Sequence, residues 1–203
     1  MTIRAIYFDL GGVILRTEDK GPRAALAHSL GMDYDRIDQL IFGSATSRQA
    51  STGLISEEQH WRSTVRSLGL PESDAPRIMD AFFAGDRVDY TLINFLRSLR
   101  TTHKTGLISN AWSGLRPWIL SDKFDDAFDY MTISAEVGVE KPDERIYRHA
   151  LKKLGVRPDE SVFVDDIPTN IAAAQALGMH GVLFKTAEQT MAEITALLDN
   201  ARG

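Results

Sequence analysis

Ala5-Ile6-Tyr7-Phe8-Asp9-Leu10-Gly11-Gly12-Val13 is the stretch from which the fold can be inferred. Its first four residues form an apolar run rich in β-formers, which predicts a buried strand. Asp9 then stands at the carboxyl end of that strand, where open α/β sheets bind their ligands. Gly11 and Gly12 let the backbone approach a ligand closely and expose amide donors to it. Taken alone, the segment favours an aspartate that merely caps a turn.

A second predicted strand ends in two adjacent carboxylates. Ser161-Val162-Phe163-Val164 is another short apolar run; Asp165 and Asp166 follow it, and Pro168 then opens a helix. Adjacent carboxylates repel each other unless a cation is present or one of them is protonated. Their hard oxygen atoms suit Mg²⁺, which usually takes one or two carboxylates together with phosphate oxygens. One aspartate could cap the next helix, but two beside Asp9 favour a metal site.

Two further segments carry groups suited to an anion. Thr105-Gly106-Leu107-Ile108 predicts a strand that ends in Ser109 and Asn110, just before a helical stretch. A hydroxyl and free amides at a helix start can bind a phosphate. Lys141 also precedes a helix, and its compact charge can hold a phosphoryl oxygen. Singly, Ser109 would more often be a helix cap and Lys141 a solvated surface residue.

Strands alternate with helices along most of the chain. We expect strands near residues 4–9, 104–109, 129–133, 161–165 and 181–184, and helices near residues 89–101, 143–154, 168–177 and 187–200. This alternation predicts an α/β fold, with a Rossmann-like parallel sheet flanked by helices.

A helical segment interrupts the alternation. Within residues 16–88 we expect helices near 22–30, 34–42, 56–68 and 74–84. The third has a capping-box pattern, with Ser56 as N-cap and Gln59 three residues on. The chain is therefore expected to comprise an α/β core, residues 1–15 and 89–203, and a helical insertion, residues 16–88.

The order of the polar strand ends resembles a known superfamily. Asp9, Ser109, Lys141-Pro142 and Asp165-Asp166 are similar to the four-motif series of the haloacid dehalogenase-like (HAD) hydrolases, over nearly the whole chain. The first motif, FDLGGV, resembles that of the soluble epoxide hydrolase amino-terminal phosphatase domain and of bacterial sugar-1-phosphate phosphatases. The helical insertion resembles this superfamily's small cap domain, a lid that excludes water and selects substrate. A helical subdomain without a lid role is the alternative.

The resemblance implies a function and a set of site residues. It implies a Mg²⁺-dependent phosphomonoester hydrolase that forms an aspartyl-phosphate on Asp9 and acts on a small phosphorylated metabolite. The implied metal ligands are Asp9, the Gly11 carbonyl and Asp166, with Asp165 as a ligand or a support. The residues implied to bind the phosphate are Gly11, Gly12, Ser109, Asn110 and Lys141, and those implied in catalysis are Asp9, Ser109 and Lys141.

Gly11 departs from the family pattern. HAD phosphatases typically carry an aspartate two positions after the nucleophile, where it acts as general acid and base. A glycine keeps the carbonyl for the metal but has no group to protonate the leaving oxygen. Good leaving groups, such as the anomeric oxygen of a sugar 1-phosphate, would suffer least, which points to a small sugar phosphate. Glu18 or Asp19 is a candidate replacement for the acid.

Two other functions stay open. A metal-independent 2-haloacid dehalogenase would also lack the second aspartate, but it would not need the metal-binding pair Asp165 and Asp166. A catalytically weak HAD domain that serves as a binding module is the other alternative, and the retained Asp9, Ser109 and Lys141 argue against it. Arg48, in the helical insertion, is the residue we would test first for substrate contact. The tryptophans, Trp61, Trp112 and Trp118, fit packing roles better than substrate platforms.

Composition narrows the range of possible partners. The chain has 203 residues, of which 43% are hydrophobic, and a formal net charge of −5 with no long basic run. This argues against nucleic acid or a membrane as partner and leaves a small-molecule phosphate, with the protein a monomer or homodimer. There are no cysteines, so neither a disulfide framework nor a thiolate zinc site is possible. No apolar run approaches membrane-spanning length, so a cytoplasmic location is expected.

Overall fold

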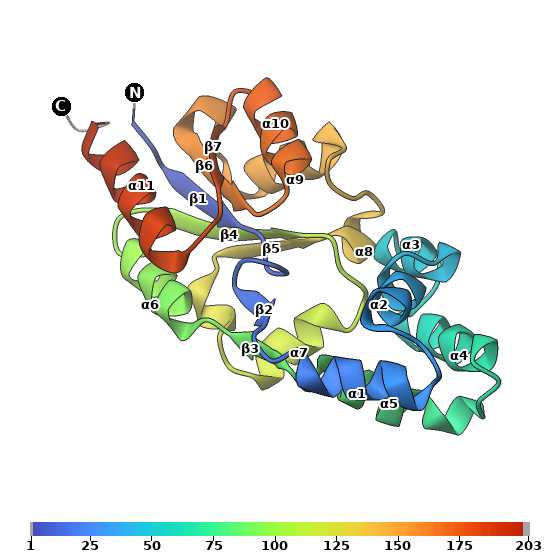
Figure 1. Cartoon of the computed structure of the whole chain (residues 1–203). Helices are drawn as coiled ribbons and strands as arrows, with labels where there is room; N and C mark the ends of the chain where they lie inside the picture. The colour runs from blue at the N-terminus through green and yellow to red at the C-terminus, as the bar shows by residue number, and fades with distance from the viewer. Residues whose placement is uncertain (1, 201–203) are drawn as a thin grey trace.

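The computed structural model describes residues 2–200 and is built around a parallel sheet with the strand order β5-β4-β1-β6-β7 (Figure 1). Its strands are β1 (Ala5–Phe8), β4 (Lys104–Ser109), β5 (Tyr130–Ile133), β6 (Ser161–Asp165) and β7 (His180–Leu183). Each lies within one residue of its expected position, and all neighbours pair in parallel. The predicted fold class is confirmed.

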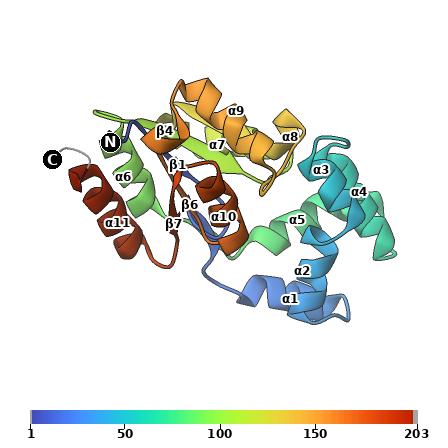
Figure 2. The same cartoon turned by 90° about the horizontal axis from the view of Figure 1, so that it is seen from above.

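Helices cover both faces of the sheet (Figures 1 and 2). On one face lie α6 (Tyr90–Leu99) and α11 (Ala187–Asn200), and on the other α9 (Glu144–Leu154) and α10 (Pro168–Ala176). Side chains alternate between the faces of a strand, so Ile6 and Phe8 of β1 join the first cluster and Ala5 and Tyr7 the second. Because both faces are covered, β1 reads as a continuous apolar run.

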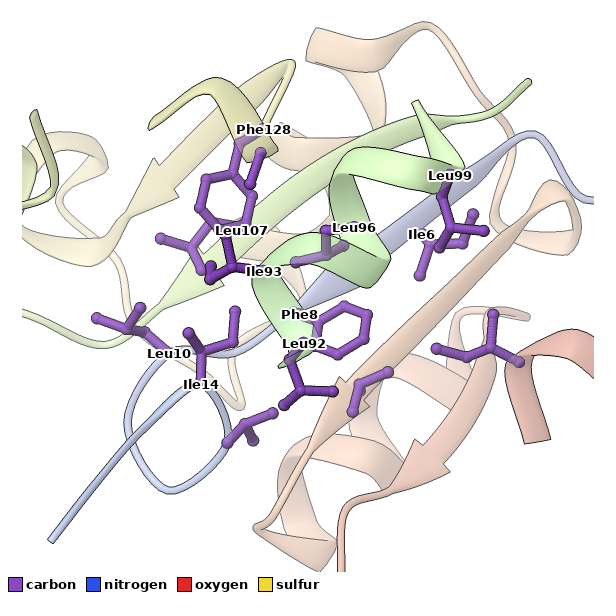
Figure 3. Close-up of a cluster of buried hydrophobic side chains, with 14 of the residues drawn as sticks. Ile6, Phe8, Leu10, Ile14, Leu92, Ile93, Leu96, Leu99, Leu107 and Phe128 are labelled. Carbon is purple, nitrogen blue, oxygen red and sulfur yellow. The ribbon is translucent and has the colours of Figure 1, made fainter. Parts of the chain in front are cut away.

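The loop after β1 is anchored in the first of these clusters. Figure 3 shows Leu10 and Ile14 beside the side chains of β1 and α6. Leu10 is 3% exposed and Ile14 is fully buried. These two buried residues therefore anchor both ends of the turn that contains Gly11 and Gly12.

The helical insertion leaves and rejoins the sheet through two paired strands. β2 (Leu15–Thr17) and β3 (Asp86–Val88) are antiparallel neighbours. Between them lie α1 (Gly21–Ser29), α2 (Tyr34–Phe42), α3 (Ala45–Ser51), α4 (Glu57–Ser67), η1 (Glu72–Asp74) and α5 (Ala75–Phe83), grouped at one end of the sheet (Figure 1). The four helices expected in this segment are present as α1, α2, α4 and α5. The short helix α3 and the two strands were not expected, because such short elements show little periodicity.

Four short elements complete the described chain. They are α7 (Leu115–Ser121), η2 (Asp125–Ala127), α8 (Ser134–Val137) and η3 (Pro158–Glu160). Within residues 2–200, no helix has both the length and the apolar character needed to cross a membrane.

The helices α1–α5 have an apolar core of their own, and one residue from outside the insertion completes it. Trp112, in the loop after β4, is 9% exposed and belongs to this cluster. Its ring stacks on Phe42 at 5.7 Å and meets Trp61 edge-on at 5.7 Å. Its Nε1 donates to the Ser47 carbonyl at 3.3 Å. Trp61 and Trp112 therefore pack, as the sequence suggested, and join the insertion to the sheet.

Candidate active site

Sheet register brings the strand-end carboxylates together. Phe8 of β1 pairs with Leu107 of β4 and with Val164 of β6. The residues that follow Phe8 and Val164 are Asp9 and Asp165, so their side chains leave neighbouring strands at the same level. Both are buried, with exposed fractions of 6% and 0%. Two buried carboxylates side by side require a cation or protonation.

Lys141 supplies a cation. Its Nζ lies 2.8 Å from Oδ2 of Asp9 and 2.6 Å from Oδ2 of Asp165, and its side chain is only 1% exposed. Asn110 fixes the backbone of Lys141: its amide nitrogen donates to the Lys141 carbonyl at 2.9 Å, and its Oδ1 accepts from the Lys141 N–H at 2.7 Å. The buried Ser109 precedes Asn110 at the end of β4. These bonds join the loop after β4 to the segment between α8 (Ser134–Val137) and α9.

The environment of Asp9 opposes its charge. Burial raises the pKa of Asp9 to about 6, although Lys141 and the N–H of Leu10, which donates to Oδ1 at 2.7 Å, favour the ionised form. A carboxylate that is only 6% exposed and contacts one cation is poorly hydrated. It can therefore act on an electrophile without first losing a shell of water.

Asp165 and Asp166 differ in surroundings despite being adjacent. Asp165 accepts from Lys141, from the backbone N–H of Ile167 at 2.8 Å and from Asn170 at 3.1 Å. Asp166 is exposed and lines the cleft above the sheet. Partial desolvation of its carboxyl group, followed by the charge of Asp165, raises the pKa of Asp166. Asp165 thus contacts Lys141, whereas Asp166 faces the cleft.

The three aspartates form a possible cation site. Asp9, Asp165 and Asp166 each offer a carboxylate oxygen, and these oxygens lie within 4.8 Å of one another. Such hard oxygen donors are the ligands that Mg²⁺ prefers. Gly12 lies directly against this group: its φ is +78°, and a Cβ there would lie 2.2 Å from Oδ2 of Asp166. A residue with a side chain would be strained at this positive φ and would place its Cβ too close to Asp166, so only glycine fits here.

Gly11 differs from Gly12. A Cβ built on Gly11 meets no atom of the described residues within 4 Å, and its φ is not positive. The position that would carry the family's acid–base aspartate is thus open and accessible.

A cleft of ≈ 2520 Å³ extends from these residues to the helical insertion. Gly11, Gly12, Ser109, Asn110 and Lys141 line it on the sheet side, and α2, α3, α4 and α5 line the opposite side. Arg48 also lines it and donates to the Gly43 carbonyl at 2.9 Å. All the residues that the sequence singled out for catalysis, phosphate or metal therefore line one cavity, except Asp165, which is fully buried.

Glu18 and Asp19, the candidate replacement acids, are not among the described residues that line the cleft. Glu18 pairs with Arg16 at 2.9 Å, and Asp19 accepts from the N–H of Gly21 at 2.8 Å. Arg16 also pairs with Asp89 at 2.9 Å, beside the paired strands. Both carboxylates serve local structure, so neither is placed to replace the acid.

Sequence reasoning missed the residues that support the site. Asn170 is 3% exposed and holds both oxygens of Asp165. Ser51 of α3 donates to Glu140, the neighbour of Lys141, at 2.6 Å. The placement of an asparagine in the first turn of the helix after the aspartate pair was the available signal for Asn170. Nothing in the sequence points to the Ser51–Glu140 contact.

Comparison with known proteins identifies relatives over most of the chain. The family model of haloacid dehalogenase-like hydrolases matches residues 3–178. The chain is 36% identical to a glyceraldehyde 3-phosphate phosphatase from Pyrococcus furiosus, over 90% of this chain and 81% of the relative. It is 28% identical to a sesquiterpene phosphatase from Aspergillus oryzae, over 97% of both.

Two further matches concern a larger protein and a solved structure. Bifunctional epoxide hydrolase 2 from Sus scrofa is 27% identical over 96% of this chain, which spans 38% of that protein's length. A HAD family enzyme from Bacteroides thetaiotaomicron, solved in complex with magnesium and inorganic phosphate, superimposes with a TM-score of 0.76 at 22% identity. The aligned parts are 91% of this chain and 96% of that one, so the fold is shared.

Proposed function

Because the chain belongs to the haloacid dehalogenase-like hydrolase family, we propose that it is a Mg²⁺-dependent phosphomonoester hydrolase that forms an aspartyl-phosphate on Asp9. The observation that carries the proposal is the buried Asp9 carboxylate, with Nζ of Lys141 at 2.8 Å and two further aspartates at its side. Phosphatases among the relatives support this reaction class. Metal-free dehalogenation is less well supported, because it has no use for the exposed carboxylate of Asp166.

The cation site fits magnesium by its donor set. Asp9, the Gly11 carbonyl and Asp166 would hold the ion. Asp165 would support the site by accepting a hydrogen bond from Lys141. When bound, the ion supplies positive charge that offsets the repulsion between an anionic nucleophile and an anionic phosphate. The magnesium and phosphate in the neighbour from Bacteroides thetaiotaomicron support this choice.

The chain's own residues carry the chemical steps. An oxygen of Asp9 attacks phosphorus in line, the bond from phosphorus to the ester oxygen breaks, and the leaving group departs with the electron pair as an alkoxide or phenolate, which takes its proton from solvent. Ser109, the backbone N–H of Asn110 and Lys141 would hold the phosphoryl oxygens, where negative charge accumulates. Water then attacks the phosphorus of the aspartyl-phosphate, which releases inorganic phosphate and regenerates Asp9.

The helical insertion, residues 16–88, is proposed to act as the lid of this site. Two contacts support a closed arrangement: Ser51 with Glu140 at 2.6 Å, and Oε2 of Glu57 with the N–H of Gly114 at 2.8 Å. Each joins the insertion to a loop that holds phosphate-binding residues. A lid in this position would exclude water from the reacting phosphorus and contact the alcohol part of the substrate.

A phosphate-release assay with and without Mg²⁺, beside an assay for halide release from 2-haloacids, tests the function. We expect phosphate release that EDTA abolishes and no halide release. Halide release without metal would replace this proposal with dehalogenation, and the absence of both activities would favour a binding module. The substrate is expected to be a small phosphorylated metabolite, a class that includes the compound named for the glyceraldehyde 3-phosphate phosphatase among the relatives.

Asp166→Ala should weaken Mg²⁺ binding more than Asp165→Ala. Asp166 is exposed at the cleft, whereas Asp165 is already engaged by Lys141 and Asn170. Isothermal calorimetry with Mg²⁺ measures both variants, and Asp80→Ala, which removes an exposed carboxylate elsewhere in the cleft, is the matched control. Equal losses, or a larger loss for Asp165→Ala, would contradict the assignment.

Gly11→Asp should make the rate less sensitive to the leaving group. The wild-type protein has no acid at this position, so kcat/KM on aryl phosphates should fall as the leaving phenol becomes more basic. The new side chain has room, because nothing described lies within 4 Å of a Cβ at Gly11. A general acid is worth about 10²–10⁴-fold on the poorest leaving groups.

Gly11→Asn is the matched control for this series, because it has the same shape and no acidic proton. It should keep the steep dependence of the wild-type protein. A flat dependence of kcat/KM in the wild-type protein would show that another residue already supplies the proton.

A further inference from the structure

The cleft has an exposed aromatic surface on the side of the insertion. Phe42, the last residue of α2, is 45% exposed although it is large and apolar. Its ring stacks on Trp112 at 5.7 Å with an interplanar angle of 29°, and meets Phe82 and Phe83 edge-on at 5.4 and 6.3 Å. Phe42, Phe83 and Trp112 all line the cleft. We call these three residues the aromatic wall.

Two polar residues of the cleft near this wall, Arg23 and Glu57, are already paired within the protein. Arg23 pairs with Asp38 at 2.8 Å and with Asp86 at 3.2 Å. Glu57 accepts from Trp61 Nε1 and from the Gly114 N–H. The hydroxyls of a sugar would have to displace these internal contacts, and such an exchange brings little net gain. An apolar group on the wall would displace only water.

The aromatic wall is continuous with the phosphate-binding loop. Trp112 lies two residues after Asn110, whose side chain holds the backbone of Lys141. Figures 1 and 2 show α2 and α3 at the end of the sheet where this loop emerges, with α3 beside α8. A phosphoryl group held at Lys141 therefore leaves its alcohol part in the cavity that the wall lines.

Building on the proposed function, we propose that the site hydrolyses phosphomonoesters of phenols, with the aromatic ring of the substrate against the exposed ring of Phe42. The wall offers stacking and edge contacts to such a ring. The absence of a side chain at Gly11 fits the same class, because a phenol, with a pKa of about 10, leaves as phenolate without a proton. In the step, the bond from Asp9 to phosphorus forms, the bond from phosphorus to the aryl oxygen breaks, and phenolate takes the electron pair.

The test compares phenyl phosphate with 2-naphthyl phosphate, whose leaving groups are similar in acidity but differ by one ring. The wild-type protein should favour the naphthyl ester in kcat/KM by about tenfold, from the additional apolar area buried. Phe42→Ala should reduce that ratio by about fivefold, mainly through KM, because the ring contact is made before the chemical step. Phe42→Leu keeps an apolar side chain for folding and should give an intermediate ratio.

Leu54→Ala is the matched control. It removes an exposed apolar side chain of the insertion, 77% exposed, that is not among the cleft-lining residues, so the ratio should stay at the wild-type value. Acetyl phosphate and glycerol 3-phosphate complete the panel. No phosphate release from any of these four compounds would overturn the proposed function itself. Two results would overturn only the aromatic substrate class. One is a higher kcat/KM on glycerol 3-phosphate than on 2-naphthyl phosphate, and the other is a naphthyl-to-phenyl ratio of kcat/KM that Phe42→Ala leaves unchanged.

Discussion

Asp9→Asn is expected to abolish turnover and leave the fold intact. An amide of the same shape keeps the contact with the Leu10 N–H, but it carries no negative charge and cannot attack phosphorus. Removal of a catalytic nucleophile lowers kcat by about 10⁴-fold or more. Because burial disfavours the charge on Asp9, the neutral variant should be no less stable than the wild-type protein.

Initial rates on the best ester, together with thermal unfolding, check this expectation. Rapid-quench trapping should show a phosphorylated protein for the wild type and none for Asp9→Asn. Asp80→Asn, at an exposed carboxylate of the same cleft, is the matched control and should retain activity. If Asp9→Asn keeps wild-type kcat on any ester that the enzyme hydrolyses, the covalent mechanism is wrong.

Lys141→Met is expected to lower stability strongly as well as activity. Lys141 is the cation that both Asp9 and Asp165 contact, at 2.8 and 2.6 Å, and its side chain is 1% exposed. Removing one partner of a buried ionic group leaves charge without compensation and costs about 3–5 kcal/mol. The phosphoryl oxygens would also lose the positive charge of Lys141, so the turnover rate should fall as well.

Urea unfolding in metal-free buffer measures how much Lys141→Met lowers the free energy of unfolding. Lys20→Met, at an exposed lysine that also lines the cleft, should change the free energy of unfolding little. The double variant Lys141→Met/Asp165→Asn should recover part of the loss, because it neutralises one of the stranded carboxylates. A loss for Lys141→Met no larger than that for Lys20→Met would show that the pocket does not depend on this cation.

Much of the sheet was predictable from local sequence. The strand over residues 5–8 is apolar at every position because both of its faces are covered, and such runs need no tertiary information to be recognised. A polar residue directly after such a run lies at the carboxyl edge of the sheet. That rule placed Asp9, Ser109 and the pair Asp165-Asp166 in one region before any contact was known.

The supporting contacts were not predictable, because they join segments far apart in the chain. Asn110 and Lys141 are 31 positions apart, Ser51 and Glu140 are 89 apart, and Trp112 completes a cluster whose other members lie in the insertion. A single sequence has no signal for such pairs, since each residue alone fits a surface or packing role. The same limit applies to β2 and β3, whose pairing is what makes them strands.

The sequence by itself determined the α/β fold, the family and the identity of the charged groups at the strand ends. Hydrophobic periodicity and the order of short motifs can be recognised along the chain without knowing which residues are in contact. Only the tertiary structure decided how those groups divide their roles. Burial at the sheet edge engages Asp165 with Lys141 and Asn170, while Asp166, one residue further along, turns out of the sheet to the cleft. Adjacent identical residues differ here because desolvation and hydrogen bonding depend on the packing around each side chain.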